Sequence, residues 1–468
     1  SLFLTDGRVG SIVGTDTIRN GTFFFKRNVG ESGMDQLSLM CRDTDFPPMS
    51  LDIYATPGAK IKVTGTNPLI YTWRVDSPVK EQQEHNRFIE DSRDLWDEFQ
   101  RLAIKERSMR SASEAERKAL RTKSDSISSI INQRELKLMK ELPISNVWME
   151  KLLRLSMSLK YNSRFTNKEE ILALYDRLNE EQKASIEGQE IRVNLFPPKT
   201  VKEGDDMADA DLFDLDGKVH HLADFKGKYM LLDFWSSGCG PCIMALPEMK
   251  EIQEQYKDRL TIISLSSDTQ TRWKAASTQH EMTWQNLSDL KQTAGLYAVY
   301  DVNGIPNYVL ISPEGKIVKM WSGYGKGSLK LKMRRYLDAP KREMSITGDT
   351  NRKVVNYPSF ESTNTDILEV KQVELTDTAT IVHFYAYYIP KYWIQVSVNA
   401  KLVDEQGASY TLQKADGITP GKHFFLPESG EAEFSLTFKP LPLKTKSFNF
   451  TEGTAKNDWQ INGVKLTK

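Results

Sequence analysis

Two of the three cysteines in this chain of 468 residues, Cys239 and Cys242, stand three positions apart. Such a pair suits dithiol/disulfide chemistry, in which one thiolate attacks a disulfide and the second thiol resolves the mixed disulfide. An apolar strand is predicted over residues 229–235, and after a short turn Cys239 opens a predicted helix. The free N–H groups and positive dipole end of a helix stabilise a thiolate, and residues three apart share a helix face. We therefore predict Cys239 as the nucleophile and Cys242 as the resolving thiol.

The dipeptide between the cysteines, Gly240-Pro241, suits a helix start. Proline is tolerated in the first turn because the N–H that it lacks would have no partner there. Pro247 falls inside the same predicted helix and is expected to bend it.

The third cysteine, Cys41, alternates with polar residues in step with Leu37 and Leu39. This period of two places the three side chains on one face of a strand. We therefore predict that Cys41 is a buried, small apolar side chain and not a reactive thiol. Three cysteines are also too few for a scaffold held together by disulfides.

Bulk composition narrows the class of protein. Lys+Arg and Asp+Glu are both 63, so the formal net charge is zero and no global field attracts nucleic acid or anionic lipid. We expect no nucleic-acid partner.

No apolar run is long enough to span a bilayer. Because the chain starts at Ser1 without methionine, we expect that a signal or anchor segment has been removed.

The pattern along the chain changes three times, which predicts a multidomain protein. Short alternating strands give way to helical spacing, and a Pro-Pro pair at 197–198 precedes an α/β run. Alternation returns near the C-terminus, where residues 394–402 and 434–438 are predicted strands. The predicted regions are a small β domain at 1–78, a helical region at 79–195, a central α/β domain at 200–340 and a β-sandwich at 345–468.

Three segments carry a family resemblance. The run 233–242 (DFWSSGCGPC) with Pro247, the hairpin 211–219 and the segment 302–316 resemble exported thiol–disulfide oxidoreductases of the TlpA/ResA type. The resemblance covers about residues 200–340 and implies a thioredoxin-like fold. The flanking regions are similar, at the level of pattern, to multidomain members from Bacteroidetes.

The resemblance implies roles for residues outside the cysteine pair. Pro306 matches the cis-proline that packs against the cysteines, and its cis bond would turn the backbone of Ile305 toward a substrate strand. Asp233 matches the buried acid, whose raised pKa allows it to exchange a proton with the resolving thiol. Together with Cys239 and Cys242, Asp233 is therefore expected to be catalytic. Supporting or substrate-binding roles are expected for Ile305, Pro306, Trp235, Gly240 and Pro241.

Three positions depart from the family pattern. Gly238 stands in place of a second tryptophan, Ala245 in place of a glutamate and Asn307 in place of a threonine. These departures leave the chemistry intact and the substrate preference open.

The resemblance also implies partners and a compartment. We expect protein disulfide substrates, a membrane thiol electron donor and a periplasmic or cell-envelope location, including anchoring through a removed N-terminal segment. No cofactor beyond the Cys239–Cys242 disulfide and no metal are expected. The Gly-Pro dipeptide is similar to that of reducing thioredoxins and favours a disulfide reductase over an oxidase.

Three alternatives remain open. A structural zinc site needs four ligands, but Cys41 lies in another predicted domain and the pair His220-His221 has no ligand companions. A thiol peroxidase of the same fold would need an isolated activated cysteine, which the paired Cys242 argues against. A binding or scaffold protein with a vestigial site is the third alternative, although neither cysteine is lost.

Overall fold

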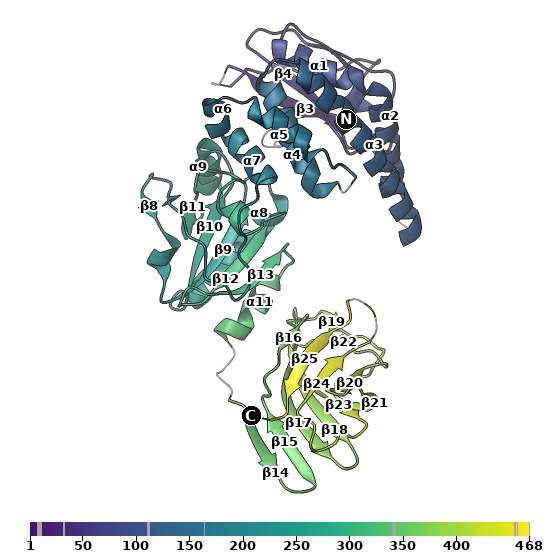
Figure 1. The fold of residues 1–468 in the computed structure, drawn as a ribbon, viewed down its shortest axis with the longest axis vertical. Helices are drawn as coiled ribbons and strands as arrows, with labels where there is room; N and C mark the ends of the chain where they lie inside the picture. Colours follow the sequence, from purple (N-terminus) through teal and green to yellow (C-terminus); the bar gives the residue numbers. More distant parts are fainter. Residues whose placement is uncertain are drawn as a thin grey trace. The chain divides into compact units, whose positions relative to one another are not determined.

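A computed structural model describes residues 1–6, 12–30, 33–109, 113–162, 164–338, 343–453, 455 and 457–467. The chain forms two compact units, one of Ser1–Ile243 with Ile262–Ser322 and the other of Met244–Thr261 with Gly323–Lys468. The predicted class is confirmed, with a central α/β domain after strands and helices and before an antiparallel β region (Figure 1). The predicted boundary at 340 lies outside the described residues.

The N-terminal strands form a small antiparallel sheet in the order β2-β1-β3-β4, beside a separate two-stranded ladder of β5 and β6. Leu37, Leu39 and Cys41 are buried on one face of β3, which confirms the alternation predicted there. The strands are β1 (Leu2–Asp6), β2 (Ile12–Asp16), β3 (Asp35–Cys41), β4 (Leu51–Ala55), β5 (Lys62–Thr64) and β6 (Arg74–Asp76).

The predicted helical region follows. Ser113 begins the longest of these helices with a capping box, in which its hydroxyl accepts from the Glu116 N–H and the Glu116 carboxylate accepts from the Ser113 N–H. The helices are α1 (Lys80–Asp91), α2 (Arg93–Ser108), α3 (Glu114–Glu141), α4 (Asn146–Tyr161), α5 (Lys168–Asp176), α6 (Glu180–Ala184) and α7 (Ile186–Leu195).

The central sheet has the order β11-β10-β9-β12-β13, and β12 runs antiparallel to both β9 and β13 (Figure 1). On β9, Met230, Leu232 and Phe234 enter the main core of this domain, so Asp233 and Trp235 lie on the opposite face. The elements are β7 (Leu212–Phe213), β8 (Val219–His220), β9 (Tyr229–Trp235), α8 (Gly240–Tyr256), β10 (Leu260–Ser266), α9 (Gln270–Gln279), β11 (Gln285–Leu287), α10 (Leu296–Val299), β12 (Asn307–Ile311), β13 (Ile317–Ser322) and α11 (Ser328–Leu337).

Ten C-terminal strands form one continuous antiparallel sheet in the order β14-β15-β17-β18-β23-β21-β20-β24-β25-β16, and β19 and β22 form a separate two-stranded ladder. Strand β21 joins its two halves, because it pairs with β20 at one end and with β23 at the other. The register shifts between Leu412 and Lys414, and such bulges let a strand pass from one layer to the next. Both halves contribute to a single apolar core, as in a sandwich.

These C-terminal strands are β14 (Ser345–Gly348), β15 (Arg352–Asn356), β16 (Ser362–Thr363), β17 (Leu368–Thr376), β18 (Thr380–Tyr387), β19 (Trp393–Ile394), β20 (Lys401–Asp404), β21 (Ser409–Asp416), β22 (Phe424–Phe425), β23 (Glu431–Phe438), β24 (Ser447–Thr451) and β25 (Gln460–Lys465).

One strand prediction in this region was wrong. The alternation over residues 394–402 predicted a single strand, but β19 ends at Ile394 and β20 begins only at Lys401. A turn interrupts the run, because Ser397 accepts the Asn399 N–H with its hydroxyl and the Ala400 N–H with its carbonyl. Val398, at the tip of this turn, is 62% exposed.

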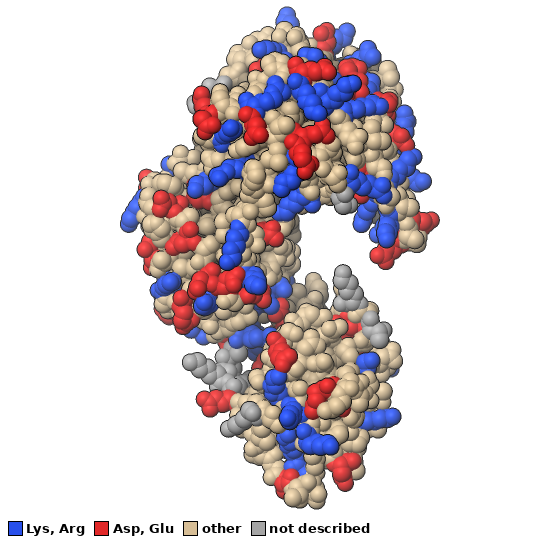
Figure 2. All heavy atoms as spheres, in the orientation of Figure 1, with Lys and Arg blue, Asp and Glu red and all other residues tan. Residues whose placement is uncertain are grey.

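Charges of both signs are interspersed over the face seen in Figure 2, in keeping with the zero formal charge. In the part of the chain that the structure describes, no helix combines the length and the apolar character that a bilayer crossing requires.

Candidate functional site

Cys239 and Cys242 are joined by a disulfide at the start of α8, with their Cα atoms 5.2 Å apart. The helix begins at Gly240, and the carbonyl of Cys239 accepts the N–H of Ile243, so Cys239 is the N-cap residue. The N–H of Cys242 donates to Cys239 Sγ at 3.2 Å. The same donor would stabilise a thiolate on Cys239 after the disulfide is reduced.

Exposure distinguishes the two sulfur-bearing residues. Cys239 is 8% exposed and Cys242 is 3% exposed, so Cys239 is the more accessible of the two. Both cysteines pack in a small apolar cluster with Trp235 and Trp273, and Ile305 borders this cluster. This arrangement favours attack on a large substrate through Cys239 and resolution through Cys242.

The turn between β9 and α8 is held by a carboxylate that sequence analysis missed. Asp268 accepts the N–H of Ser237 at 2.6 Å and the Ser237 hydroxyl at 3.1 Å. Arg272 pairs with the same carboxylate at 3.5 Å. Asp268 lies two residues after the end of β10, and only the packed structure shows that it reaches the cysteine turn.

The Ile305–Pro306 peptide bond is cis. Pro306 directly precedes β12, which pairs with β9. Asn307 begins β12, and its Nδ2 donates to the Ser322 hydroxyl at 2.7 Å. The structure therefore brings Ile305 and Trp235 to one cluster with the cysteine pair, while the substrate-binding roles of Ile305 and Pro306 stay predictions.

Asp233 is 2% exposed and lies on the same face of β9 as Trp235. Burial raises the pKa of its carboxyl group from 3.8 to about 7, although a hydrogen bond from Ser264 opposes the rise. The Ser264 hydroxyl donates to Asp233 Oδ2 at 2.7 Å and accepts the Trp284 indole N–H at 2.8 Å. Sequence analysis missed Ser264 and Trp284, because this chain of contacts exists only after the strands pair.

Other candidate ligands lie apart from the cysteine pair. His220 contacts Asp214 at 2.8 Å and His221 contacts Asp211 at 2.9 Å, so each imidazole pairs with a carboxylate of its own hairpin. Within the described ranges, no group of three or more His, Cys, Asp and Glu side chains is arranged to hold a metal ion.

Cys41 is 5% exposed, and burial raises the pKa of its thiol above the usual value. We expect Cys41→Ala to retain full reactivity of the Cys239–Cys242 pair. In native reduced protein, a maleimide should label Cys41 at least about tenfold more slowly than Cys239, because the reactive species is an accessible thiolate. Labelling of Cys41 at the rate of Cys239, followed by peptide mass analysis, would show that Cys41 is accessible.

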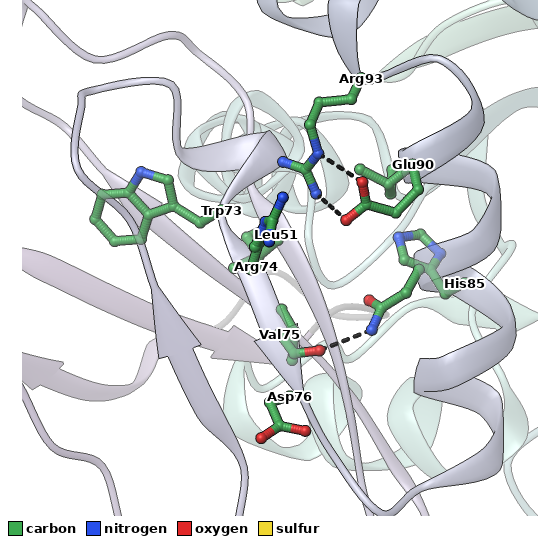
Figure 3. Close-up of a pocket in the computed structure, with 10 residues that line it drawn as sticks. Leu51, Trp73, Arg74, Val75, Asp76, His85, Glu90 and Arg93 are labelled. Atoms are coloured by element: carbon green, nitrogen blue, oxygen red, sulfur yellow. Dashed lines mark hydrogen bonds and ion pairs between the residues drawn. The ribbon is translucent and has the colours of Figure 1, made fainter.

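A pocket of about 240 Å³ lies between β6 and α1, away from these cysteines in the sequence (Figure 3). The guanidinium of Arg93, which lines this pocket, is already hydrogen-bonded, since it donates to Glu90 at 2.6 and 2.9 Å and to the Thr72 carbonyl. The Asn86 amide donates to the Val75 carbonyl at 2.7 Å. We assign no chemistry to this pocket.

Comparisons with known proteins agree with the geometry at the cysteine pair. The model of the AhpC/TSA family matches residues 204–320. The thioredoxin-like protein YneN of Bacillus subtilis is 30% identical over 121 residues, which are 25% of this chain and 69% of YneN. The thiol-disulfide oxidoreductase ResA of Geobacillus thermodenitrificans is 32% identical over 139 residues, which are 29% of this chain and 79% of that ResA.

A solved structure, the thioredoxin domain of a thiol-disulfide oxidoreductase from Bacteroides vulgatus, is 29% identical. The match covers 30% of this chain and all of that domain, with a TM-score of 0.28. The sequence relatives, matched over most of their own length, establish the relationship. Through its central domain, the chain therefore belongs to the thioredoxin-like thiol-disulfide oxidoreductases, the family that includes ResA.

Proposed function

We propose that this protein reduces disulfide bonds in exported proteins by cycling Cys239 and Cys242 between dithiol and disulfide. One observation carries the proposal: the two cysteines are bonded at the N-terminus of α8, where the Cys242 N–H donates to Cys239 Sγ. That donor lowers the free energy of a thiolate at Cys239 more than that of a thiol.

The proposed cycle is balanced in atoms and electrons. The Cys239 thiolate attacks one sulfur of a substrate disulfide, forms a mixed disulfide and releases the first substrate thiolate. Cys242 then loses its proton and attacks Cys239 Sγ, which forms the Cys239–Cys242 disulfide and releases the second substrate thiolate. An external dithiol returns two electrons to the pair. Within the chain itself, no group beyond the two cysteines has to carry electrons.

Asp233 is proposed to accept the proton of Cys242. Its pKa of about 7 lets the carboxylate gain and lose a proton near neutral pH, which is what a general base requires. Asp233 shares a face of β9 with Trp235, which packs against both cysteines. Many proteins of the TlpA/ResA type have a glutamate at the position of Ala245. This chain has no carboxylate there that could accept the proton in place of Asp233.

We expect Asp233→Asn to slow release of the reduced substrate by about 100-fold and to affect the first attack by Cys239 much less. Stopped-flow tryptophan fluorescence with a disulfide substrate separates the two steps. Asp216→Asn, an exposed aspartate in the neighbouring hairpin, is the matched control. Slowing of the first step alone, or of neither step, would remove Asp233 from the mechanism.

The same substitution should change how stability depends on pH. Because the folded-state pKa of Asp233 is raised, its protonated form favours folding below about pH 4, and this contribution is lost as the pH rises through 7. A shift of about three pKa units corresponds to about 4 kcal/mol. Urea unfolding at pH 8 should therefore find Asp233→Asn more stable than the wild type by up to about 4 kcal/mol, and the gain should vanish near pH 4.

The direction of electron transfer and the cellular location of the protein are part of the same proposal. Gly240-Pro241 supports reduction, because thioredoxins with this dipeptide are reductants. The family resemblance supports a membrane thiol donor and a periplasmic or cell-envelope location. Ile305, beside the cysteine cluster, is proposed to offer its backbone to an extended substrate strand next to Pro306.

Reduction of insulin by dithiothreitol, followed as turbidity, tests the proposal directly. The full chain should accelerate the reaction, and pretreatment with a chelator should not change the rate. Hydrogen peroxide should be consumed no faster than by Cys239→Ser, since the proposal assigns no peroxidase activity. An absence of insulin reduction would favour the scaffold alternative, and fast peroxide turnover would favour the peroxidase.

A further inference from the structure

Exposed apolar side chains of the C-terminal β region gather at one place. Among the described residues from 343 to 467, the large apolar side chains with high exposure are Tyr392, Trp393, Val398 and Phe425. Three of them line one cavity, and Phe425 is the cross-strand partner of Trp393 in the ladder of β19 and β22. Exposed apolar side chains that gather in one patch mark an interaction site more often than apolar side chains scattered singly over a surface.

The cavity is large enough to hold more than one side chain. Its volume is about 750 Å³, within the range of ligand pockets. We call it the aromatic groove, because Tyr388, Tyr392, Trp393 and Trp459 line it. The rings of Tyr388 and Tyr392 are almost perpendicular, at 85° with centroids 6.3 Å apart, and thus form two differently oriented walls.

Local hydrogen bonds fix the walls of the aromatic groove. Glu452 accepts the Ser397 N–H at 3.1 Å and the Trp459 N–H at 3.2 Å, which ties two lining segments together. The Ser397 turn that interrupts the predicted strand presents Val398 outward. The imidazole of His423 stacks on Trp393 at 3.8 Å and supports that ring from one side. The groove is therefore shaped before any ligand arrives.

The lining also indicates which ligand fits. Gln395 and Asn457 contribute amides, which can donate to and accept from the peptide groups of an extended chain. The charged side chains among the described lining residues, Glu452 and Asp458, are both acidic. An aliphatic part made by Ile394 and Val398 offers no hydrogen bond to the hydroxyls of a sugar, so a polyhydroxylated ligand would leave its own groups unsatisfied there.

We propose that the aromatic groove binds extended segments of unfolded polypeptide that combine aromatic or aliphatic side chains with lysine or arginine. This inference rests on the proposed function, because a protein disulfide reductase acts on such chains. Two binding sites on one chain raise the effective concentration of a substrate disulfide at Cys239 without any new contact at the cysteines. The aromatic groove thus selects substrates by unfolded character and not by disulfide chemistry.

The test compares variants of the full chain. Tyr392→Ser/Trp393→Ser removes two exposed rings, and Val398→Lys adds a positive charge, which repels lysine and arginine, at a 62% exposed site where folding is little affected. Phe196→Ser is the matched control, because Phe196 is 54% exposed and lies at the end of the helical region. Circular dichroism and reduction of a small aromatic disulfide confirm that each variant is folded and has a working cysteine pair.

The expected result is a separation of kinetic constants. For a denatured, disulfide-containing protein, both groove variants should raise KM about tenfold with kcat unchanged, as loss of one interface anchor would do. A cysteine-free peptide of leucine, phenylalanine and lysine should bind the wild type and Phe196→Ser about tenfold more tightly than either groove variant. The same peptide with glutamate in place of lysine should bind about tenfold more weakly to the wild type.

Each contrary outcome is distinct. If the wild type does not reduce the small disulfide, the proposed function itself fails. If it does, but KM and peptide affinity are unchanged in both groove variants, the aromatic groove has no role in substrate capture. Saturable binding of a maltose or cellulose oligosaccharide, lost in the variants, would assign the groove to sugars. A change from dimer to monomer in light scattering would assign it to a second copy of the chain.

Discussion

Cys239→Ser should abolish the reduction of protein disulfides, with a loss on the order of 10³-fold or more in kcat/KM. A serine hydroxyl is not ionised at neutral pH and is a far poorer nucleophile toward sulfur than a thiolate. The donor that Cys242 N–H supplies to Cys239 Sγ would stabilise no charge in the variant. The proposed cycle routes all of the catalysis through this sulfur, so we expect no other described group to replace it.

The measurement is insulin reduction at a fixed dithiothreitol concentration, with Cys41→Ala as the control. Because Cys41 is 5% exposed and lies in the N-terminal strands, its loss should leave the rate within about a factor of two of the wild type. Turnover by Cys239→Ser above a few per cent of the wild-type rate would contradict the assignment of Cys239 as nucleophile.

Cys242→Ser should instead convert the enzyme into a trap. The Cys239 thiolate can still attack a substrate disulfide, but nothing resolves the product, so the mixed disulfide accumulates. Cys242 is almost buried beside Cys239, which leaves little room for an outside thiol to take its place. Most of the variant should be found covalently joined to a denatured disulfide-containing substrate.

Intact mass and non-reducing electrophoresis detect the adduct, and Cys239→Ser/Cys242→Ser is the control that should form none. Addition of dithiothreitol should release the substrate with both of its thiols free. If Cys242→Ser turns over like the wild type, Cys242 is not the resolving thiol. If Cys239→Ser is the variant that accumulates adduct, the two cysteines have the opposite roles.

Local sequence predicts the elements around the cysteines well. The strand predicted at 229–235 has the same bounds in the structure as β9. It is a short apolar run followed by a turn, so the signal is contained in adjacent positions. The helix after the cysteine turn begins one residue later than predicted, at Gly240, because Cys239 serves as its N-cap.

Residues that act across strands could not be predicted in this way. Asp268 accepts a hydrogen bond from Ser237 in the turn before Cys239, and Ser264 donates one to Asp233. In each pair the two residues are 31 positions apart in the sequence. Polar residues of this kind have no sequence period, and only pairing of β10 beside β9 brings them close. The wrong strand at 394–402 has a local cause, since alternation alone does not reveal the turn at Ser397.

The reduction potential of the Cys239–Cys242 couple tests the central claim most directly. The full chain would be equilibrated at pH 7 in dithiothreitol buffers of graded poise, with the fluorescence of Trp235 and Trp273, which pack with both cysteines, as the readout. We predict a two-electron transition near about −270 mV, as expected for a disulfide reductase. A potential near about −120 mV, that of a strong oxidant, or no transition that depends on Cys239 and Cys242, would contradict it.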